Sequence, residues 1–186
     1  MQDEENLVRR AKQRDQKAFG ELYEEHFDKI YRYVALRIGD KTEAEDMTQQ
    51  VFLKALQSVS SFQWKGIPFA AWLFRIAHNQ VVDYLRKKNK QAAILFDESL
   101  VSSDSNPQLL AERRLDIEQL LLATKRLTEA QREVISLRFT SELPIAQVAT
   151  IMGKSQGAVK ALQHSAIVAL RKVLLVENNE EGQGIS

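Results

Sequence analysis

The sequence IAQVATIMGKSQGAVKAL at residues 145–162 is the most informative segment of this chain. Its apolar residues recur every three or four positions on both sides of Gly153, which predicts two short helices joined by a tight turn. Gly153 can adopt the positive φ of that turn, and Ala149 is small where the two helices would cross most closely. A shared core would come from Val148, Met152, Val159 and Leu162. The combination predicts a helix-turn-helix, with an ordinary helical hairpin as the alternative interpretation.

The second helix of this unit carries polar side chains suited to contact with DNA bases. Ser155 can cap its N-terminus, the end that enters the major groove when a helix-turn-helix binds DNA. Glutamine can pair with adenine and lysine can donate to guanine, and each good pair contributes about 1–3 kcal/mol of discrimination. We therefore predict DNA contacts from Ser155, Gln156, Lys160, Gln163 and His164.

Helical periodicity also covers most of the N-terminal half. Apolar side chains follow one stripe over residues 15–38, which predicts a long helix. A second helix opens at Thr42, which has a capping-box partner in Glu45, and ends near Leu56. A third helix covers residues 69–89 and leads into a basic run.

A change in composition marks the boundary between two helical domains. Periodicity fails after residue 91, and SSDSNP at residues 102–107 is typical of a linker. Helicity resumes near Leu109, and no strand pattern of useful length is present. We expect an all-α protein with a first domain over residues 1–90, a flexible linker over 91–111, a second domain with the helix-turn-helix over 112–176 and a tail over 177–186.

Capping signals delimit the helices of the second domain. Thr128 and Gln131 form a capping box for a helix over residues 129–139. Pro144 suits the first turn of the next helix, and the last helix would extend to about Val176.

The net charge of +1 conceals two basic segments with an acidic one between them. Residues 61–90 carry six basic and one acidic side chain, and residues 113–175 carry ten and five. Residues 91–112 carry four acidic side chains and no basic one. Clustered Lys and Arg favour phosphate contact through counterion release, which suggests two nucleic-acid surfaces on one chain. Ordinary solvated helix faces are the alternative.

Several functional classes are disfavoured by what the sequence lacks. The chain has no cysteine and three histidines, which excludes disulfides, thiol chemistry and sulfur-ligated zinc sites. We find no catalytic constellation, phosphate-cradling Gly loop or metal-ligand cluster, and therefore expect no enzymatic activity, cofactor or metal. His78 lies near Asp83 without a nucleophile, so we interpret it as a solvated or partner-facing side chain. No apolar stretch approaches the ~20 residues of a bilayer span, so we expect a cytoplasmic protein without membrane insertion.

Three blocks of sequence resemble one known family. The block LTEAQREV at residues 127–134, followed by the helix-turn-helix, forms the C-terminal part of the resemblance. The N-terminal half adds AFGELY at residues 18–23 and AEDMTQQVFLKA at residues 44–55. WLFRIAHN at residues 72–79 and DYLR at residues 83–86 complete it. In this order, the blocks resemble those of the extracytoplasmic-function sigma factors of bacterial RNA polymerase.

The resemblance implies a role in transcription initiation, with core RNA polymerase and promoter DNA as partners. It implies that one face of the second helix binds a coiled coil of the largest polymerase subunit through Asp46, Gln49, Gln50 and Lys54. These residues are polar at i, i+3, i+4 and i+8, so a single helix face can present them together. A merely solvated face is the alternative.

The resemblance also implies that residues 58–68 and the helix around Asn79 hold the unpaired strand of the minus-ten element, with one base flipped out. Single-stranded bases stack on aromatic rings and their phosphates bind Lys and Arg, which offsets the few kcal/mol that unstacking costs. Trp72 and Phe74 belong to the core instead, because aromatic residues at helical spacing usually pack. The candidates are Phe62, Trp64, Lys65, Asn79, Arg86, Lys87 and Lys88.

The recognition helix departs from the family pattern. Many relatives carry arginines in its middle, where this chain has Leu162, Ser165 and Ile167. With fewer cations there, affinity for the minus-thirty-five element would be low or would rest on Arg138, Lys154 and Lys160.

Two further hypotheses concern regulation and class. Members of this family are commonly inhibited by an anti-sigma factor inserted between the domains, and the acidic linker between two basic domains suggests such a partner here; simple packing of the linker is the alternative. A free-standing helix-turn-helix repressor or activator would explain the C-terminal half, but it leaves residues 44–55 and 62–90 without a role.

Overall fold

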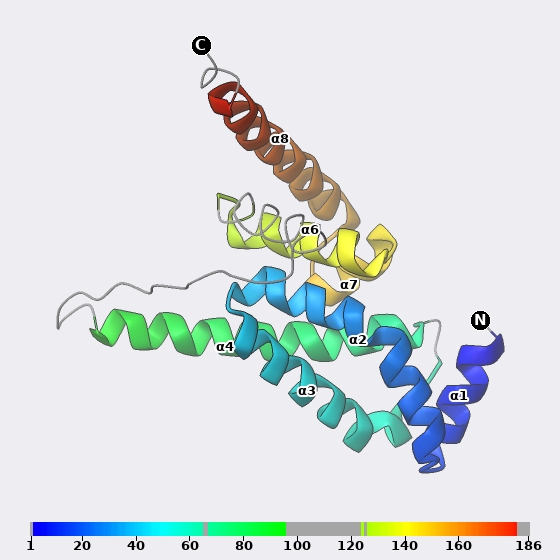
Figure 1. Ribbon diagram of the computed structural model, residues 1–186. Helices are drawn as coiled ribbons and strands as arrows, with labels where there is room; N and C mark the ends of the chain where they lie inside the picture. The colour runs from blue at the N-terminus through cyan, green and yellow to red at the C-terminus, as the bar shows by residue number, and fades with distance from the viewer. Residues whose placement is uncertain (1, 65–66, 96–123, 125, 182–186) are drawn as a thin grey trace.

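Helices alone make up the secondary structure of the described residues (Figure 1). The computed structural model describes residues 2–64, 67–95, 124 and 126–181. The N-terminal domain contains α1 (Gln2–Lys12), α2 (Gln16–Ile38), α3 (Lys41–Ser58), the 3-10 helix η1 (Val59–Ser61) and α4 (Phe69–Leu95). The C-terminal domain contains α6 (Glu129–Ser141), α7 (Ile145–Met152) and α8 (Gln156–Glu181). The all-α prediction is confirmed.

The ends of α2 follow from its capping residues. The Asp15 carboxylate accepts hydrogen bonds from the backbone N–H groups of Lys17 and Ala18 at 3.0 and 3.2 Å. Gly39 terminates the helix in the left-handed conformation, with φ of 79°. An N-cap acid and a left-handed glycine satisfy backbone groups that would otherwise lack partners.

The predicted capping residue of α3 was two residues too late in the sequence. The helix begins at Lys41 because Asp40, rather than Thr42, caps it by accepting from the backbone N–H of Glu43 at 2.9 Å. The helix also continues to Ser58, past the predicted end at Leu56. Aspartate at the N-cap competes well with threonine, which explains the shift.

The first helix has no counterpart in the sequence prediction. α1 is short and its buried apolar residues are few, with Val8 and Ala11 exposed by 0% and 3%. Acidic residues in its first turn and basic residues in its last turn complement the helix dipole. The ammonium group of Lys12 donates to the backbone carbonyl of Phe62 at 2.7 Å, which ties α1 to the segment after η1.

The helix-turn-helix forms as predicted. Thr128 and Gln131 make both hydrogen bonds of a capping box at the start of α6. Gly153 adopts φ of 62° between α7 and α8, and the Ser155 hydroxyl accepts from the backbone N–H of Ala158 at 3.2 Å. Val148 and Val159 are fully buried in the shared core.

Three other helices are also longer than predicted. α4 continues to Leu95, into the segment expected to be linker, and α8 continues to Glu181, into the expected tail. α6 ends at Ser141. The rest of the expected linker and the predicted helical onset near Leu109 lie outside the described residues. No helix in the described segments is both long enough and apolar enough to cross a bilayer.

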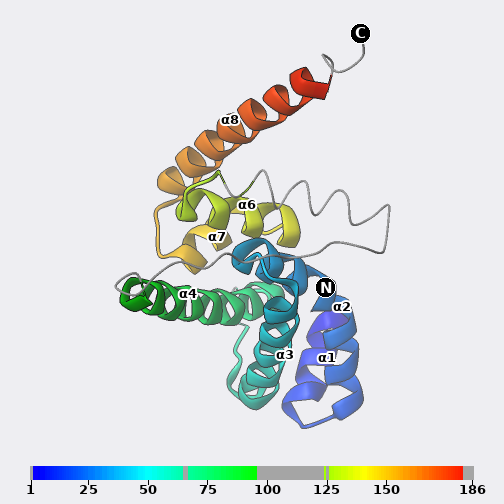
Figure 2. The same cartoon turned by 60° about the vertical axis from the view of Figure 1, so that its left-hand side comes forward.

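The two domains are in direct contact. α6 lies against α2 and also touches α4, and α7 touches α4 (Figures 1 and 2). α8 leads away from the N-terminal domain, so much of it extends beyond the rest of the molecule (Figure 2).

Candidate nucleic-acid and protein interfaces

α3 presents a mixed polar and apolar surface to solvent. The four residues predicted to bind the polymerase are all exposed: Asp46, Gln49, Gln50 and Lys54. Two leucines on the same helix, Leu53 and Leu56, are exposed by 56% and 48%. Protein interfaces combine apolar area with a polar rim, so a protein partner can cover both kinds of side chain. The sequence prediction did not include them, although leucines outside the apolar stripe of α3 were a usable signal.

The aromatic candidates for base stacking are divided between core and surface. Phe62 is only 3% exposed, and its ring centroid lies 5.3 Å from Trp64 and 5.1 Å from Trp72. Its ring is therefore part of the core and is not free to stack on a base. Trp64 is half-buried and is the aromatic candidate with accessible surface. Phe74 is fully buried, and Trp72 is partly buried against the same core, as predicted. Lys65 lies outside the described residues.

The polar candidates on α4 are accessible. Arg86 pairs with Asp83 at 3.0 Å, and the Lys88 ammonium lies 3.4 Å from the Glu43 carboxylate. Exposed pairs of this kind contribute about 0–1 kcal/mol, so a DNA phosphate could replace either carboxylate. The hydrogen bond with Tyr84 raises the pKa of Lys88, which keeps its side chain cationic. The exposed candidates on this helix are Asn79, Arg86, Lys87 and Lys88.

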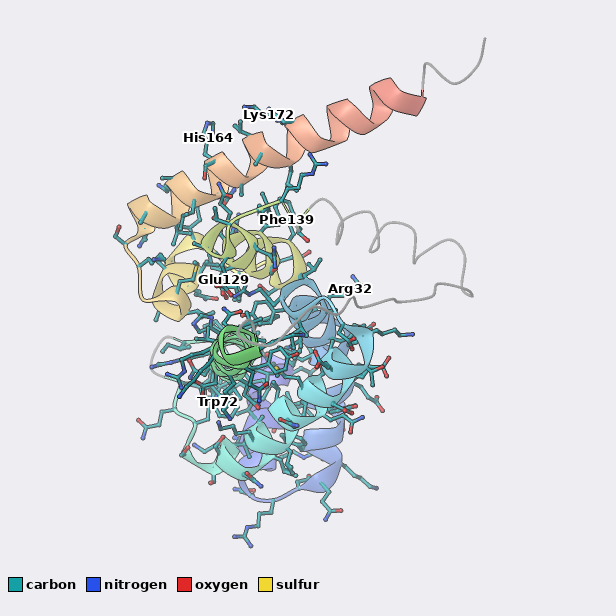
Figure 3. All side chains as sticks on the ribbon, turned by 90° about the vertical axis from the view of Figure 1, so that its left-hand side faces the viewer. Arg32, Trp72, Glu129, Phe139, His164 and Lys172 are labelled. Atoms are coloured by element: carbon teal, nitrogen blue, oxygen red, sulfur yellow. The ribbon has the colours of Figure 1, made fainter. Side chains whose placement is uncertain are left out.

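The N-terminal half of α8 carries the predicted base-contacting residues on an accessible surface. Gln156, Lys160 and His164 follow one another at four-residue steps and are exposed, as are Lys154 and Ser155 in the turn before the helix. Figure 3 shows His164 and Lys172 on the outer side of α8, away from the other helices. The helix therefore offers a continuous polar face.

Two of the residues predicted to contact DNA, Arg138 and Gln163, bind each other within the helix-turn-helix domain. The Arg138 guanidinium donates to the Gln163 side-chain oxygen at 3.2 Å and also to the backbone carbonyl of Leu143. Arg138 thus joins α6, the following loop and α8. Ser165, which stands where relatives often carry arginine, accepts from the Gln131 amide at 3.0 Å and joins the start of α6 to α8. Both contacts stabilise the helix-turn-helix, which leaves fewer free donors for DNA.

A buried carboxylate connects the two domains. Glu133 on α6 is 4% exposed, and three side chains of the N-terminal domain surround its carboxylate. The Tyr33 hydroxyl donates to it at 2.8 Å, the Arg37 guanidinium lies at 2.8 Å and His78 Nδ1 lies at 2.8 Å. Arg37 is itself only 2% exposed and also lies 3.7 Å from Glu129. A buried charge is tolerated only with partners of this kind.

The protonation of this cluster follows from its partners. Burial opposes ionisation of Glu133, but the hydrogen bond from His78 and the charge of Arg37 outweigh burial and lower its pKa. Burial and the Glu133 charge raise the pKa of Tyr33 well above its usual value. Glu133 is therefore a carboxylate and Tyr33 a neutral donor at pH 7.

An open cleft of about 510 Å³ lies beside this contact, between α4 and the helix-turn-helix. Its lining includes Arg86 from α4, Lys154 from the turn before α8, and Glu129 and His78 near the buried carboxylate. Cationic DNA candidates from both domains thus border one cleft.

The sequence predicted neither the cleft nor Glu133, because a single sequence does not indicate that residues 37 and 133 lie in contact. His78 faces the other domain of its own chain rather than solvent or a separate protein.

Two protein-family models match the chain in order. Residues 22–91 match sigma-70 region 2, and residues 123–172 match sigma-70 region 4. The first match covers most of the N-terminal domain, and the second covers the helix-turn-helix.

Curated relatives and solved structures agree with these matches. The chain is 37% identical over 170 residues to the ECF RNA polymerase sigma factor BldN of Streptomyces coelicolor, covering 90% of this chain and 64% of BldN. It is 31% identical over 180 residues to the ECF sigma factor SigW of Bacillus subtilis, covering 90% of this chain and 94% of SigW.

The structure of the sigma factor RpoE from Bartonella quintana, solved with the anti-sigma factor NepR, superposes with a TM-score of 0.73 at 25% identity, covering 86% of this chain and 98% of RpoE. CnrH, solved with the cytosolic domain of CnrY, shares the fold with a TM-score of 0.71 at 24% identity, covering 94% and 98%. With both conserved regions matched in order and a relative aligned along nearly its full length, the chain belongs to the extracytoplasmic-function sigma factors of the sigma-70 family.

Proposed function

We propose that this sigma factor binds core RNA polymerase through α3, the unpaired minus-ten strand through α4 and Trp64, and the minus-thirty-five element through α8. The observation that carries the proposal is the accessibility of all three faces on a scaffold matched by both sigma-70 regions. The factor would act by positioning polymerase rather than by catalysis, in the cytoplasm where transcription takes place. A free-standing helix-turn-helix regulator is not favoured, because it gives the region 2 match no role.

The polymerase-binding face is tested by charge reversal on α3. The double variant Asp46→Lys, Lys54→Glu reverses two exposed charges without touching the core. We expect the affinity for core polymerase to fall by about 100-fold, about 1.4 kcal/mol for each reversed charge. Glu24→Lys on α2 reverses another exposed charge and serves as the control. Equal polymerase binding by the double variant and the control, with unchanged circular dichroism, would contradict this assignment.

The minus-ten surface is tested on single-stranded promoter DNA in the presence of core polymerase. Trp64→Ala should weaken binding by about 1–3 kcal/mol if a base stacks on the indole. Replacing Arg86 or Lys87 by glutamine should lower the salt dependence of binding by about one charge each, with little effect on sequence preference. Unchanged salt dependence in both variants would remove these cations from the DNA surface.

The minus-thirty-five surface is tested by comparing two kinds of residue on α8. Gln156→Ala and Lys160→Ala should relax base preference in a promoter selection, because both side chains are exposed. Gln163→Ala should instead destabilise the domain with little change in base preference, because Gln163 is bonded to Arg138. A larger change of preference in Gln163→Ala than in the other two would reverse these roles.

We also propose regulation by an anti-sigma factor. The support is that the RpoE structure from Bartonella quintana was solved with one, NepR, and that a cleft between the two domains is present here. Co-purification from the native host is the test. Repeated recovery of polymerase without any small inhibitory partner, under non-inducing conditions, would count against it.

A further inference from the structure

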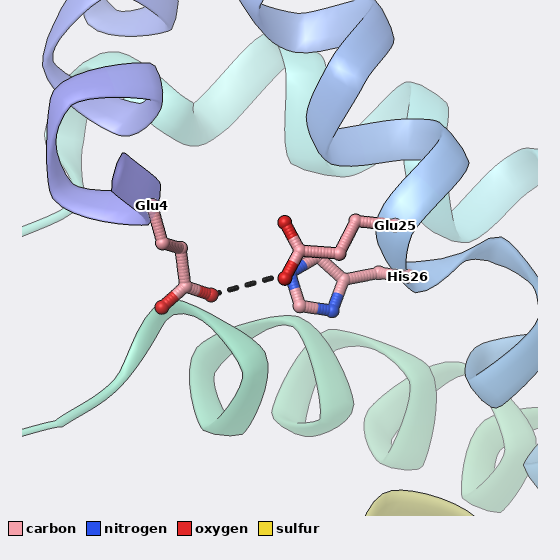
Figure 4. Close-up of side chains that lie close together, drawn as sticks. All are labelled: Glu4, Glu25 and His26. Carbon is pink, nitrogen blue, oxygen red and sulfur yellow. Dashed lines mark ion pairs between the residues drawn. The ribbon is translucent and has the colours of Figure 1, made fainter. Parts of the chain in front are cut away.

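Three potential metal ligands converge between α1 and α2 (Figure 4). Glu4 lies in the first turn of α1, and Glu25 and His26 are consecutive residues near the middle of α2. One ligand atom from each side chain lies within 4.8 Å of the other two. This cluster was not predicted, because Glu4 comes from a helix that sequence analysis did not identify.

The imidazole of His26 is buried, although neither of its ring nitrogens makes a hydrogen bond. It is 3% exposed, and its ring packs 5.6 Å from Phe69. Its Nε2 lies 3.2 Å from a Glu4 oxygen, yet neither ring nitrogen makes a hydrogen bond of acceptable geometry. Buried polar atoms without partners are rare and require an explanation. A metal ion would provide one for Nε2, because oxygens that share a metal with an imidazole lie to the side of the nitrogen lone pair and not along it.

The spacing and donor types fit a transition-metal ion. Zinc bonds of about 2.0–2.2 Å in a tetrahedral site place the ligand atoms about 3.3 Å apart. The Glu4–His26 separation already matches this value, and Glu25 is exposed and can rotate toward the other two. One imidazole and two carboxylates also balance the charge of a divalent cation. Imidazole suits zinc and similar ions, whereas calcium and magnesium require all-oxygen sites.

We propose that Glu4, Glu25 and His26 bind a divalent transition-metal ion, best matched by Zn²⁺, with the fourth position left to water. The ion joins α1 to α2 beside Phe69, the first residue of α4. α1 is an 11-residue helix, and isolated helices of that length are marginal in water. Metal binding therefore stabilises its docked position. The site is independent of the proposed function. His26 Nδ1 lacks the outer hydrogen bond that usually orients a ligating imidazole, so we expect binding about 10- to 100-fold weaker than at a site that has this bond.

The test is metal titration of the full chain after EDTA treatment and removal of any histidine tag. Zn²⁺ should bind in one equivalent and raise the melting temperature, and Co²⁺ should give the visible absorption of a four-coordinate site. Glu25→Gln is the decisive variant, because Glu25 is exposed and its loss should not unfold the protein. Its Zn²⁺ affinity should be at least about 10- to 100-fold lower, the cost of losing even an outer-shell partner.

Two matched controls separate this site from surface binding. Glu24→Gln removes the neighbouring exposed carboxylate, and His164→Gln removes an exposed histidine on α8; both should bind Zn²⁺ as the wild type does. The proposal is overturned if Glu25→Gln binds Zn²⁺ with wild-type affinity. It is equally overturned if the wild type shows no Zn²⁺ binding and no Co²⁺ spectrum. In that case Glu4 and His26 form an ion pair only.

Discussion

At the level of single residues, Glu133 makes buried polar contacts from one domain to the other. Its carboxylate accepts from Tyr33 and pairs with Arg37, and Arg37 is almost completely buried. Removing one partner of a buried ion pair typically costs about 3–5 kcal/mol, because the other charge is left unpaired. The neighbouring Glu129 is exposed by 59%, so its longer contact with Arg37 should contribute little.

Glu133→Gln should weaken the contact between the domains. The amide keeps the shape of the carboxylate but leaves Arg37 without a buried counter-charge. In urea denaturation, a double-mutant cycle with Arg37→Met should give a coupling energy of about 1–3 kcal/mol. Glu129→Gln is the matched control and should change stability by less than about 1 kcal/mol. A coupling energy near zero between residues 37 and 133 would show that the contact has no such role.

Acid should separate the domains through the same residue. Tyr33 and Arg37 on α2 and His78 on α4 face the Glu133 carboxylate, and Glu129 on α6 adjoins Arg37. The pKa of Glu133 is lowered from 4.5, so its stabilisation is fully present above that pH and is lost as the pH falls through the folded value. Small-angle scattering between pH 7 and about pH 3 should show expansion. Glu133→Gln should be less pH-dependent than the wild type in that range.

At the level of the helices, Gly153 in the turn after α7 and Gly157 in the first turn of α8 form a matched pair. A methyl group on Gly153 would meet nothing within 4 Å, so the cost of Gly153→Ala comes from its φ of +62° alone. We expect a loss of about 1–2 kcal/mol, the penalty of the left-handed conformation. Gly157→Ala lies in regular helix and should be neutral or stabilising by up to about 1 kcal/mol. Thermal melts of the two variants should shift in opposite directions or differ clearly in size.

Local signals predicted most of these helices and failed where they were weak. The Thr128 capping box, the Gly153 turn and the Ser155 cap each depend on neighbours within a few residues, and all three formed as expected. α1 was not predicted because its apolar stripe is too short to be distinguished from a solvated segment. Its helical state depends on packing against α2, which is information that its own residues do not contain.

At the scale of the whole molecule, the contact between the domains conflicts with the geometry of a promoter. The minus-ten and minus-thirty-five elements lie about 25 base pairs apart, which is about 85 Å along B-form DNA at 3.4 Å per base pair. In this structure α6 touches α2 and α4 directly. Simultaneous contact with both elements therefore requires the domains to move apart.

Energy transfer between two labels should detect that movement. The chain has no cysteine, so Asp28→Cys on α2 and Thr150→Cys on α7 introduce two unique, exposed labelling sites. Transfer should be efficient in the free protein and should fall when core polymerase and promoter DNA are added. A label pair within one domain, at Asp28 and Gln57, is the control and should not change. Equal transfer in the free and promoter-bound states would contradict separation of the domains.

The candidate site was predictable only in part, for reasons that differ by residue. Exposed polar positions such as Asp46 and Lys160 follow from helix periodicity, and the structure leaves them accessible. Phe62 and Gln163 were assigned to DNA by their residue type, but tertiary packing engages both. Glu133 could not be found, because its partners lie on other helices far away in the sequence.

The buried pair of Arg37 and Glu133 also limits how freely the two halves of this protein can be exchanged with those of other sigma factors. Consider a hybrid that joins this N-terminal half to the C-terminal half of a sigma factor without an acidic residue at the position of Glu133. In such a hybrid the Arg37 guanidinium would have no counter-charge. Exchange of a domain, and of the promoter preference that it carries, would then require residues 37 and 133 to change together.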